Sequence, residues 1–299
     1  MKKSVSLLLA ALMLTGALAG CGSSASASGT QAADGADSGV SGAITVISRE
    51  DGSGTRGAFI ELTGVEEKTA DGKKVDNTTA DAEIANKTDV VLTSVAGNEK
   101  AIGYISLGAL NDTVKAVKVD GAEATVDNVK AGAYKLSRPF NIATKGEPTG
   151  VAKDFINFIL SKEGQAVVTD NKYIAVNDAA ESFVSDGSSG QIAVGGSSSV
   201  SPVMEKLIEA YKSVNPNASI DLQTSDSTSG MTGTMDGTFA IGMASRELKD
   251  EEAAQLTGTA IALDGIAVIV NPANTIDELS MDQIKSIYVG DITDWGDLA

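Results

Sequence analysis

Three segments of this chain repeat one pattern, in which a short apolar run leads into a loop of glycine and hydroxyl residues and then into the start of a helix. The loops are Arg49–Arg56 after Ile44–Ser48, Gly195–Pro202 after Ile192–Val194, and Ser225–Gly230 after Ile220–Thr224. Strands that alternate with helices along a chain form a sheet covered by helices. The pattern therefore predicts an α/β fold.

Apolar periodicity extends this interpretation to the rest of the chain. Further strands are expected at Val90–Ser94, Ala101–Ile105, Phe140–Thr144, Phe239–Met243 and Ile261–Asn271. Helices, with apolar residues three and four positions apart, are expected at Thr55–Thr63, Gly150–Ser161, Ser201–Val214, Asp250–Leu256 and Ser280–Tyr288. Ser280 is the expected N-cap of the last of these helices.

The three loops also have the composition of an anion-binding site. The first turn of a helix offers backbone N–H groups without intrahelical partners and a partial positive charge, and small side chains let an anion approach them. One such loop alone is more often an ordinary helix cap or turn, because Ser, Thr and Gly are common in both. Three in one chain, with Arg49 beside the first, favour an anion site.

The composition excludes much of enzyme chemistry. The chain has no histidine and one cysteine, so a Ser-His-Asp triad, a Cys-His dyad, a His-ligated zinc site and an internal disulfide are all impossible. Carboxylates could still support glycoside cleavage, but one Trp, five Tyr and six Phe are few for a sugar-binding platform. We therefore expect a binding protein with no catalytic residue, no metal and no cofactor.

The N-terminus has the pattern of a lipoprotein signal peptide. Lys2 and Lys3 precede the apolar stretch Val5–Ala19, which is shorter than the roughly 20 residues of a membrane-spanning helix. Small residues then lead to Cys21, the single cysteine, which cleavage would leave as a lipidated N-terminus. We assign residues 1–21 to this signal and expect lipid anchoring on the extracytoplasmic face of the cell membrane.

The charge of the chain excludes some partners. Removing residues 1–20 takes away two lysines and no acid, which changes the formal net charge from −17 to −19. Nucleic acid is therefore not expected as a partner. Small anions are also repelled at long range, so an anion site here has to act through short hydrogen bonds in a partly desolvated cleft.

Six longer motifs are more specific than any single loop. They are Arg49–Thr55 (REDGSGT), Gly196–Pro202 (GSSSVSP), Ile241–Leu248 (IGMASREL), Ala262–Val268 (ALDGIAV), Ala101–Ile105 (AIGYI) and Leu136–Pro139 (LSRP). Together they resemble the PstS family of periplasmic-type phosphate-binding proteins. The resemblance implies a two-lobe periplasmic-binding-protein fold of type II that takes up inorganic phosphate in the interlobe cleft. It also implies a monomer that delivers phosphate to the membrane permease subunits of an ABC importer.

The order of the motifs differs from the order in that family. There, the GSSS stretch lies near the mature N-terminus, and an Asp-Trp-Gly-Asp segment is followed shortly by the arginine strand. Here the chain stops at Asp294–Ala299, whereas the arginine strand begins near Ala43. Joining residue 299 to residue 43, with 178–191 as the splice between the former termini, restores the family order. The sequence is therefore interpreted as a circular permutant.

The permuted order gives a division into domains. Residues 22–42, rich in Gly, Ser and Ala, are expected to be a flexible tether. Residues 43–135 and 269–299 are expected to form lobe II, and residues 136–268, including the splice linker 178–191, lobe I.

The resemblance also assigns roles to residues. The expected phosphate ligands are Arg49, Ser53, Gly54, Thr55, Ser198, Ser199, Ser227 and Ser245. Asp51 is expected to hold Arg49 in place. Arg246 stands where some members have an aspartate that accepts the proton of hydrogen phosphate, so the acceptor is open, with Asp51 and Asp264 as candidates.

Three other interpretations of the function stay open. The protein could be a receptor for another tetrahedral oxyanion such as sulfate or molybdate. It could be a fragment that is completed by swapping segments with a second copy. It could be a phosphatase or other hydrolase, although the chain lacks histidine and a recognisable metal cluster.

Overall fold

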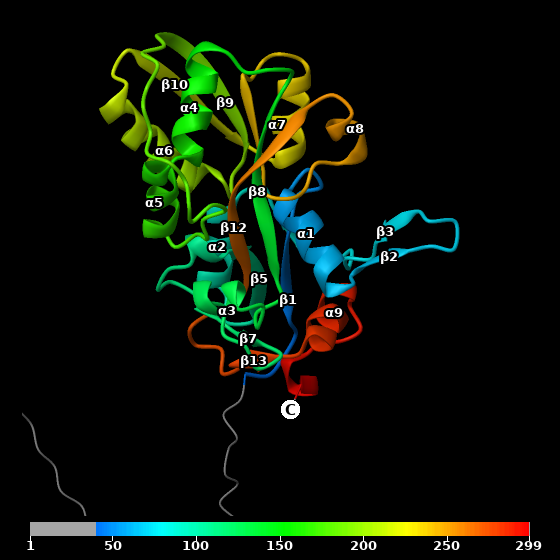
Figure 1. Cartoon of the computed structure of the whole chain (residues 1–299). Coiled ribbons are helices and arrows are strands. Elements are labelled where there is room, and N and C mark those ends of the chain that lie inside the picture. The colour runs from blue at the N-terminus through cyan, green and yellow to red at the C-terminus, as the bar shows by residue number, and fades with distance from the viewer. Residues whose placement is uncertain (1–39, 299) are drawn as a thin grey trace, which may run out of the picture. The chain divides into compact units, whose positions relative to one another are not determined.

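A computed structural model describes residues 40–298 of the chain. Its main sheet has nine strands (Figure 1). The strand order is β10 (Ala218–Ser225), β9 (Gly190–Ser197), β11 (Ile241–Ala244), β8 (Ser137–Thr144), β12 (Thr257–Val270), β5 (Ala101–Ser106), β1 (Thr45–Arg49) and β4 (Glu83–Ala85), with β6 (Lys115–Ala116) paired to β12. The prediction of an α/β fold is thereby confirmed.

Helices cover both halves of this sheet. They are α1 (Gly54–Thr63), α2 (Thr88–Ala96), α3 (Val126–Lys130), α4 (Gly150–Leu160), α5 (Lys162–Asp170), α6 (Ser201–Val214), α7 (Ser227–Met235), α8 (Asp250–Ala253) and α9 (Met281–Val289), with short 3-10 helices at Leu107–Ala109 and Trp295–Leu298. Two small sheets pair β2 (Glu66–Lys68) with β3 (Lys74–Asp76), and β7 (Lys118–Val119) with β13 (Glu278–Leu279). In Figure 1, α4–α8 surround the upper half, and α1, α2, α3 and α9 the lower half.

The long strand β12 connects the two halves. Its residues from Thr257 to Gly265 pair antiparallel with β8, and its residues from Ile266 to Val270 pair antiparallel with β5. The apolar cores divide at the same strand, because one core contains Ile266–Val270 and the other contains Ile261 and Ala262. The region around Asp264 therefore lies between two separately packed bodies.

The lower core is built from both ends of the described chain. The rings of Phe59 and Tyr104 stack with their centroids 3.9 Å apart, and Tyr288 meets Phe59 edge-on at 4.7 Å. Next to this core, Ala43 forms a bridge with Asp294. Residues that are far apart in sequence are thus required for one hydrophobic core.

The upper core packs α4, α5 and α6 against the other half of the sheet. Phe158 of α4 lies against Tyr211 of α6 with ring centroids 5.5 Å apart, and Phe183 packs edge-on against Phe158 at 5.2 Å. Phe183 belongs to the predicted splice linker, so that segment is attached to the upper core through its aromatic side chain.

Most of the expected helices and strands are present, but one predicted strand is wrong. The segment Val90–Ser94, expected as a strand, lies inside α2. Val91 and Val95 are fully buried on one face of this helix, and a Cβ added to Gly103 of β5 would lie 2.9 Å from Val91 Cγ1 and 3.0 Å from Val95 Cγ2. Packing of these valines, four positions apart, overrides the strand preference of β-branched residues.

Other helices were missed or well placed. The helix α5 was not expected, α7 begins at the helix start that was expected in the loop Ser225–Gly230, and α6 has the expected bounds. Ser280 caps α9 as expected, since its side chain accepts a hydrogen bond from the backbone N–H of Gln283.

Several predictions concern residues outside the described range. The signal peptide, Cys21 and residues 22–39 of the tether belong to this group, as does Ala299. The described end of the tether is bonded to the domain, because the Val40 N–H donates to Thr275 Oγ1 at 2.9 Å. The lobe limits at 135/136 and 268/269 remain predictions. Within residues 40–298, no helix is long and apolar enough to cross a membrane.

Candidate functional site

Hydroxyl side chains from both halves of the molecule meet near the ends of β1, β9 and β11. The hydroxyl cluster, as we call it, consists of Thr55, Thr88, Ser197, Ser198, Ser199, Ser227 and Ser245, all of which are buried. Thr55 Oγ1 lies 2.8 Å from Ser199 Oγ and 3.3 Å from Ser245 Oγ, which joins the lower half to the upper half. The three predicted loops therefore converge on one place.

Most of the predicted ligand residues belong to this cluster or touch it. Ser227 joins through its Oγ, which accepts from the Ser245 N–H at 3.1 Å. Thr88 was missed, because a strand was expected to begin near it. Its Oγ1 lies 3.4 Å from Ser198 Oγ and 3.3 Å from Ser199 Oγ.

The start of α1 places Gly54 and Thr55 against the other half. Ser53 is the N-cap, and its side chain accepts from the Arg56 N–H at 3.3 Å. A Cβ added to Gly54 would lie 2.4 Å from Ser227 Oγ and 2.8 Å from Ser245 Oγ. Glycine is thus required by the close approach of the two halves at this point.

Arg49 ends β1 with its side chain buried and only 2% exposed. Its Nη2 donates to Ser198 Oγ at 3.1 Å, so the guanidinium reaches the hydroxyl cluster from the lower half. A bidentate pair with Glu50 fixes its orientation, with Nε to Oε2 at 2.8 Å and Nη2 to Oε1 at 2.7 Å.

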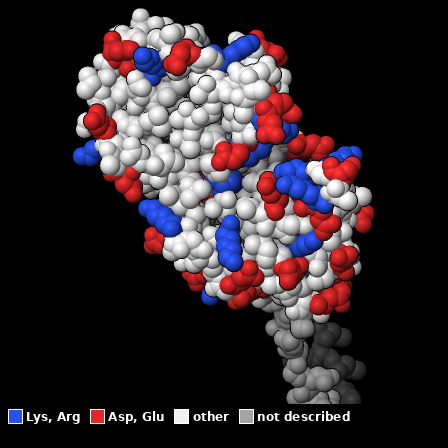
Figure 2. Space-filling model, turned by 45° about the vertical axis from the view of Figure 1, so that its right-hand side comes forward, with Lys and Arg blue, Asp and Glu red and all other residues white. Residues whose placement is uncertain are grey.

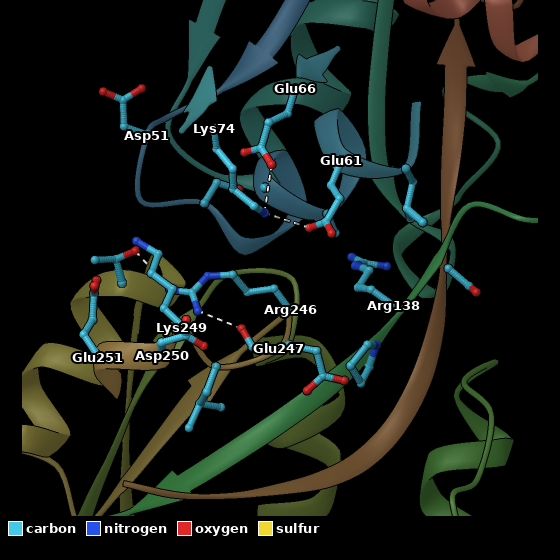
Figure 3. Close-up of a pocket in the computed structure, with 18 residues that line it drawn as sticks. Asp51, Glu61, Glu66, Lys74, Arg138, Arg246, Glu247, Lys249, Asp250 and Glu251 are labelled. Atoms are coloured by element: carbon cyan, nitrogen blue, oxygen red, sulfur yellow. Dashed lines mark hydrogen bonds and ion pairs between the residues drawn. The ribbon is translucent and has the colours of Figure 1, made fainter. Parts of the chain in front are cut away.

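Asp51 does not hold Arg49, which corrects the expectation. The Asp51 side chain is 99% exposed and forms an ion pair with Arg56 at 3.1 Å. The reason is local, because Asp51 and Gly52 form the tip of a turn that the Ser53 N–H closes onto the carbonyl of Glu50 at 3.0 Å. Figure 3 shows Asp51 at the edge of the site, pointing away from it.

A second arginine was not among the predicted site residues. Arg138 of β8 stands in register with Asp264 of β12, and their side chains form a buried ion pair. Arg138 Nη2 also donates to Thr55 Oγ1 at 3.2 Å. Burial raises the pKa of Asp264, and the adjacent charge of Arg138 acts in the opposite direction.

Neither candidate proton acceptor faces the hydroxyl cluster. Asp264 is occupied by Arg138 and by the Gly108 N–H, which lies 3.3 Å from Asp264 Oδ1. Asp51 is exposed. Among the hydrogen bonds of residues 40–298, none joins either carboxylate to the cluster.

Arg246 is hydrogen-bonded to Glu252 and Thr228 and has no hydrogen bond to the hydroxyl cluster. Its Nη1 and Nη2 lie 2.7 and 2.8 Å from the two carboxylate oxygens of Glu252, and Nη2 donates to Thr228 Oγ1 at 3.2 Å. Burial would raise the pKa of Glu252, but the hydrogen bonds from Arg246 and the Lys249 N–H hold that pKa below its ordinary value. Arg246 thereby fixes the start of α8.

A groove of ≈ 620 Å³ adjoins the cluster, between α1 and the segment Arg246–Glu251. Ser53 and Arg138 are among the residues that line it, and Figure 3 shows the side chain of Arg138 in this groove. Figure 2 shows acidic and basic side chains mixed on this side of the molecule, where the surface is hollowed between its two parts. The described residues contain no group of His, Cys, Asp or Glu side chains that could hold a metal ion.

Comparison with known proteins shows where this fold belongs. A family model described as a PBP superfamily domain matches residues 25–163 and 182–299. A protein of Streptococcus agalactiae named phosphate-binding protein PstS 2 is 50% identical over 99% of this chain and 98% of its own length. The chain belongs to the PstS family.

Other PstS proteins support the fold and bear on the order of segments. PstS 2 of Streptococcus pneumoniae is 48% identical over 99% of both chains. The crystal structure of a phosphate-binding protein of a phosphate ABC transporter from S. pneumoniae superposes with a TM-score of 0.69, at 50% identity, and covers 86% of this chain and all of that chain. The periplasmic-binding-protein fold is therefore confirmed, whereas circular permutation stays a prediction.

Proposed function

We propose that this PstS protein binds inorganic phosphate at the hydroxyl cluster and delivers it to the permease of an ABC importer. The observation that carries the proposal is that Arg49 and hydroxyl groups from both halves converge in one buried place. The names of the full-length relatives, which are phosphate-binding proteins and not enzymes, point to the same ligand.

The proposed site offers donors suited to a small oxyanion. The guanidinium of Arg49 supplies a charged donor, and Thr55, Ser198, Ser199 and Ser245 supply hydroxyl groups that can turn toward an anion. The backbone N–H groups of the first residues of α1, including Gly54 and Thr55, add to these donors. Burial strengthens each hydrogen bond, because water does not compete for it.

This arrangement suits a protein with a strongly negative charge. The long-range field of a net charge of −17 repels phosphate, so binding has to come from short contacts inside the site. Each of the two arginines at the proposed site is paired with a carboxylate, Arg49 with Glu50 and Arg138 with Asp264. An arriving dianion is therefore the only uncompensated charge, and the hydrogen-bond donors around it can stabilise it.

The location and partners belong to the same proposal. Cys21 would anchor the protein by lipid on the extracytoplasmic face of the membrane, where phosphate is captured as a monomer and passed to the permease subunits. The small-residue pattern before Cys21 supports the anchor. Ser53 would also contribute to phosphate binding, because it lies at the start of α1, where its side chain caps the helix.

Thermal unfolding with and without phosphate tests the proposal. Phosphate should raise the melting temperature, since a ligand at 100 times its Kd stabilises the folded state by about 2.7 kcal/mol. Arg49→Ala should abolish most of this rise. Lys285→Ala, which removes an exposed cation of α9, should leave it intact.

Competition by sulfate and molybdate, measured by calorimetry, separates phosphate from other oxyanions. Tighter binding of sulfate than of phosphate would replace the proposed ligand with sulfate. An Arg49→Ala protein that responds to phosphate like the unchanged protein would contradict the proposed site.

A further inference from the structure

The side chain of Arg138 is buried and is held by contacts with three neighbouring residues. It is 3% exposed, and its Nη1 donates to the Gly265 carbonyl at 2.8 Å as well as to the Asp264 carboxylate. Its guanidinium carbon lies 5.0 Å from the centre of the Phe140 ring. Asp264 and Phe140 together fix the plane in which its remaining N–H groups point.

Two nitrogen groups of Arg138, Nη2 and Nε, do not bond to Asp264. Nη2 donates to Thr55 Oγ1 at 3.2 Å, and the buried Nε has no hydrogen-bond partner among the described residues. A buried donor without a partner costs free energy, and more so when it carries charge. A purely structural ion pair would gain nothing from leaving this donor unused.

Arg138 and Arg49 are connected to each other through hydrogen bonds of the hydroxyl cluster. Arg49 donates to Ser198, Ser198 and Ser199 both contact Thr88, and Ser199 contacts Thr55, which accepts from Arg138. The two guanidinium groups come from different parts of the sheet, one from β1 and the other from β8. Figure 3 shows Arg138 in the groove, facing the space between α1 and the segment Arg246–Glu251.

We propose that Arg138 is a second phosphate-binding arginine and that Asp264 is the residue that positions it. The inference rests on the proposed function, because it assigns a further ligand to the same site. A phosphate dianion between two guanidinium groups has charged donors on two sides, with the hydroxyl groups between them. Because Arg138 lies on β8 and is paired with Asp264 of β12, the bound anion is linked through Arg138 to the strands that connect the two cores.

The double variant Arg138→Gln with Asp264→Asn tests the inference, because it removes both charges of the pair and leaves no uncompensated ion. Its folding is checked by circular dichroism and by the melting temperature without phosphate. Phosphate affinity, measured by calorimetry, should fall about 10- to 100-fold, the loss expected for hydrogen bonds from a charged donor.

A matched control comes from Arg246, the other arginine that lines the groove. The double variant Arg246→Gln with Glu252→Gln removes a second arginine–carboxylate pair that has no hydrogen bond to the hydroxyl cluster. Its phosphate affinity should fall by less than about 5-fold. A comparable loss in both double variants would show that any disturbance near the groove weakens binding, and would overturn the inference.

The role of Asp264 is tested by single substitutions. Asp264→Asn keeps Arg138 and should weaken phosphate binding less than the double variant does. Arg138→Lys, with Asp264 unchanged, should recover part of the affinity that Arg138→Gln loses, because the charge is restored without the planar geometry.

The outcomes separate this inference from the proposed function. If the unchanged protein does not bind phosphate, the proposed function fails and the role of Arg138 fails with it. If the unchanged protein and the control bind, and the folded Arg138→Gln with Asp264→Asn protein binds within about 3-fold of them, only the inference is overturned.

Discussion

At the scale of single residues, Arg246 tests how the site distinguishes anions. Its guanidinium is bonded to Glu252 and Thr228 and has no hydrogen bond to the hydroxyl cluster. Arg246→Ala should therefore weaken phosphate binding by about 2- to 5-fold, through a less ordered start of α8, without increasing the affinity for sulfate. Titration of one protein sample with each anion decides, and a gain in sulfate affinity would make Arg246 a selectivity element.

The residues of the candidate site could be predicted from the sequence where they belong to one local motif. The run from Arg49 to Thr55 identified an arginine and a helix start that the structure places together. It could not show whether Glu50 or Asp51 turns toward Arg49, because that depends on the conformation of the turn after β1. Arg138 was missed as a site residue because its place depends on the pairing of β8 with β12, which neighbouring residues do not reveal.

At the scale of elements, one carboxylate attaches the segment between β8 and β9 to the upper core. Asp154 of α4 is buried and accepts from Tyr211 Oη at 2.7 Å and Asn215 Nδ2 at 3.1 Å, both from the end of α6. It also accepts from Ser185 Oγ at 2.8 Å and from the Asp186 N–H at 2.9 Å. The predicted splice linker is therefore exposed over most of its length but fixed at this point.

Replacing this carboxylate by an amide should destabilise the protein. Asp154→Asn loses the charge and one acceptor oxygen, and we expect the free energy of unfolding at neutral pH to fall by about 2 kcal/mol. Denaturant unfolding measures the change. Asp170→Asn, at an exposed position of α5, is the matched control and should have little effect.

The effect of Asp154→Asn should depend on pH. Burial raises the pKa of Asp154, but the hydrogen bonds from Asp186, Tyr211, Ser185 and Asn215 outweigh burial and hold the pKa below its ordinary value. A carboxyl group with a lowered folded-state pKa stabilises the fold above its unfolded pKa, about 3.9, and loses this contribution as pH falls through the folded-state pKa. The stability difference between the two proteins should thus shrink below about pH 4, and a constant difference would contradict this account.

The start of α1 gives a second test at this scale. Gly54→Ala would place a methyl group against Ser227 and Ser245, whereas a Cβ at Gly57, one turn later, would meet only Arg246 Cδ at 3.9 Å. Gly54→Ala should weaken phosphate binding at least about 10-fold, for which a penalty of about 1.4 kcal/mol suffices. Gly57→Ala should bind normally, and equal affinities of the two variants would show that the halves do not need to approach so closely.

The elements themselves were predictable to the extent that one local pattern determined them. The helix α6 has apolar residues at helical spacing, and four of them, Val203, Met204, Leu207 and Tyr211, are buried as that spacing requires. The helix α7 has little apolar periodicity, because Ser, Thr and Gly fill most of its length. It is stabilised by close packing on β9 and β11, where a Cβ added to Gly230 would lie 2.6 Å from the Cα of Gly196.

At the scale of the whole molecule, the order of segments can be compared between relatives. The streptococcal PstS 2 proteins align with the whole chain, so they share its order.

The junction that a permutation requires is present in the structure. Ala43 forms a bridge with Asp294, the Ile44 N–H donates to the Thr293 carbonyl at 2.8 Å, and the Trp295 N–H donates to the Gly42 carbonyl at 3.1 Å. The described ends of the domain therefore lie side by side, as Figure 1 also shows. A short linker between them would cross no core strand, and chain ends near each other at the surface favour tolerance of permutation.

A protein rebuilt in the other order should therefore fold and bind phosphate. It would begin at Gly187, run to Leu298, continue through a short Gly/Ser linker into Val40, and end at Asp186, with new termini in the exposed segment between β8 and β9. The expected result is a monomer with phosphate affinity within about 3-fold of the unchanged chain, because both cores keep all their residues and the Arg49–Ser198 contact is retained. Native mass measurement over a range of concentrations, followed by calorimetry, would check both points. A rebuilt protein that folds only as a dimer, together with an unchanged chain whose mass also rises with concentration, would favour exchange of segments between copies over a self-contained permuted domain.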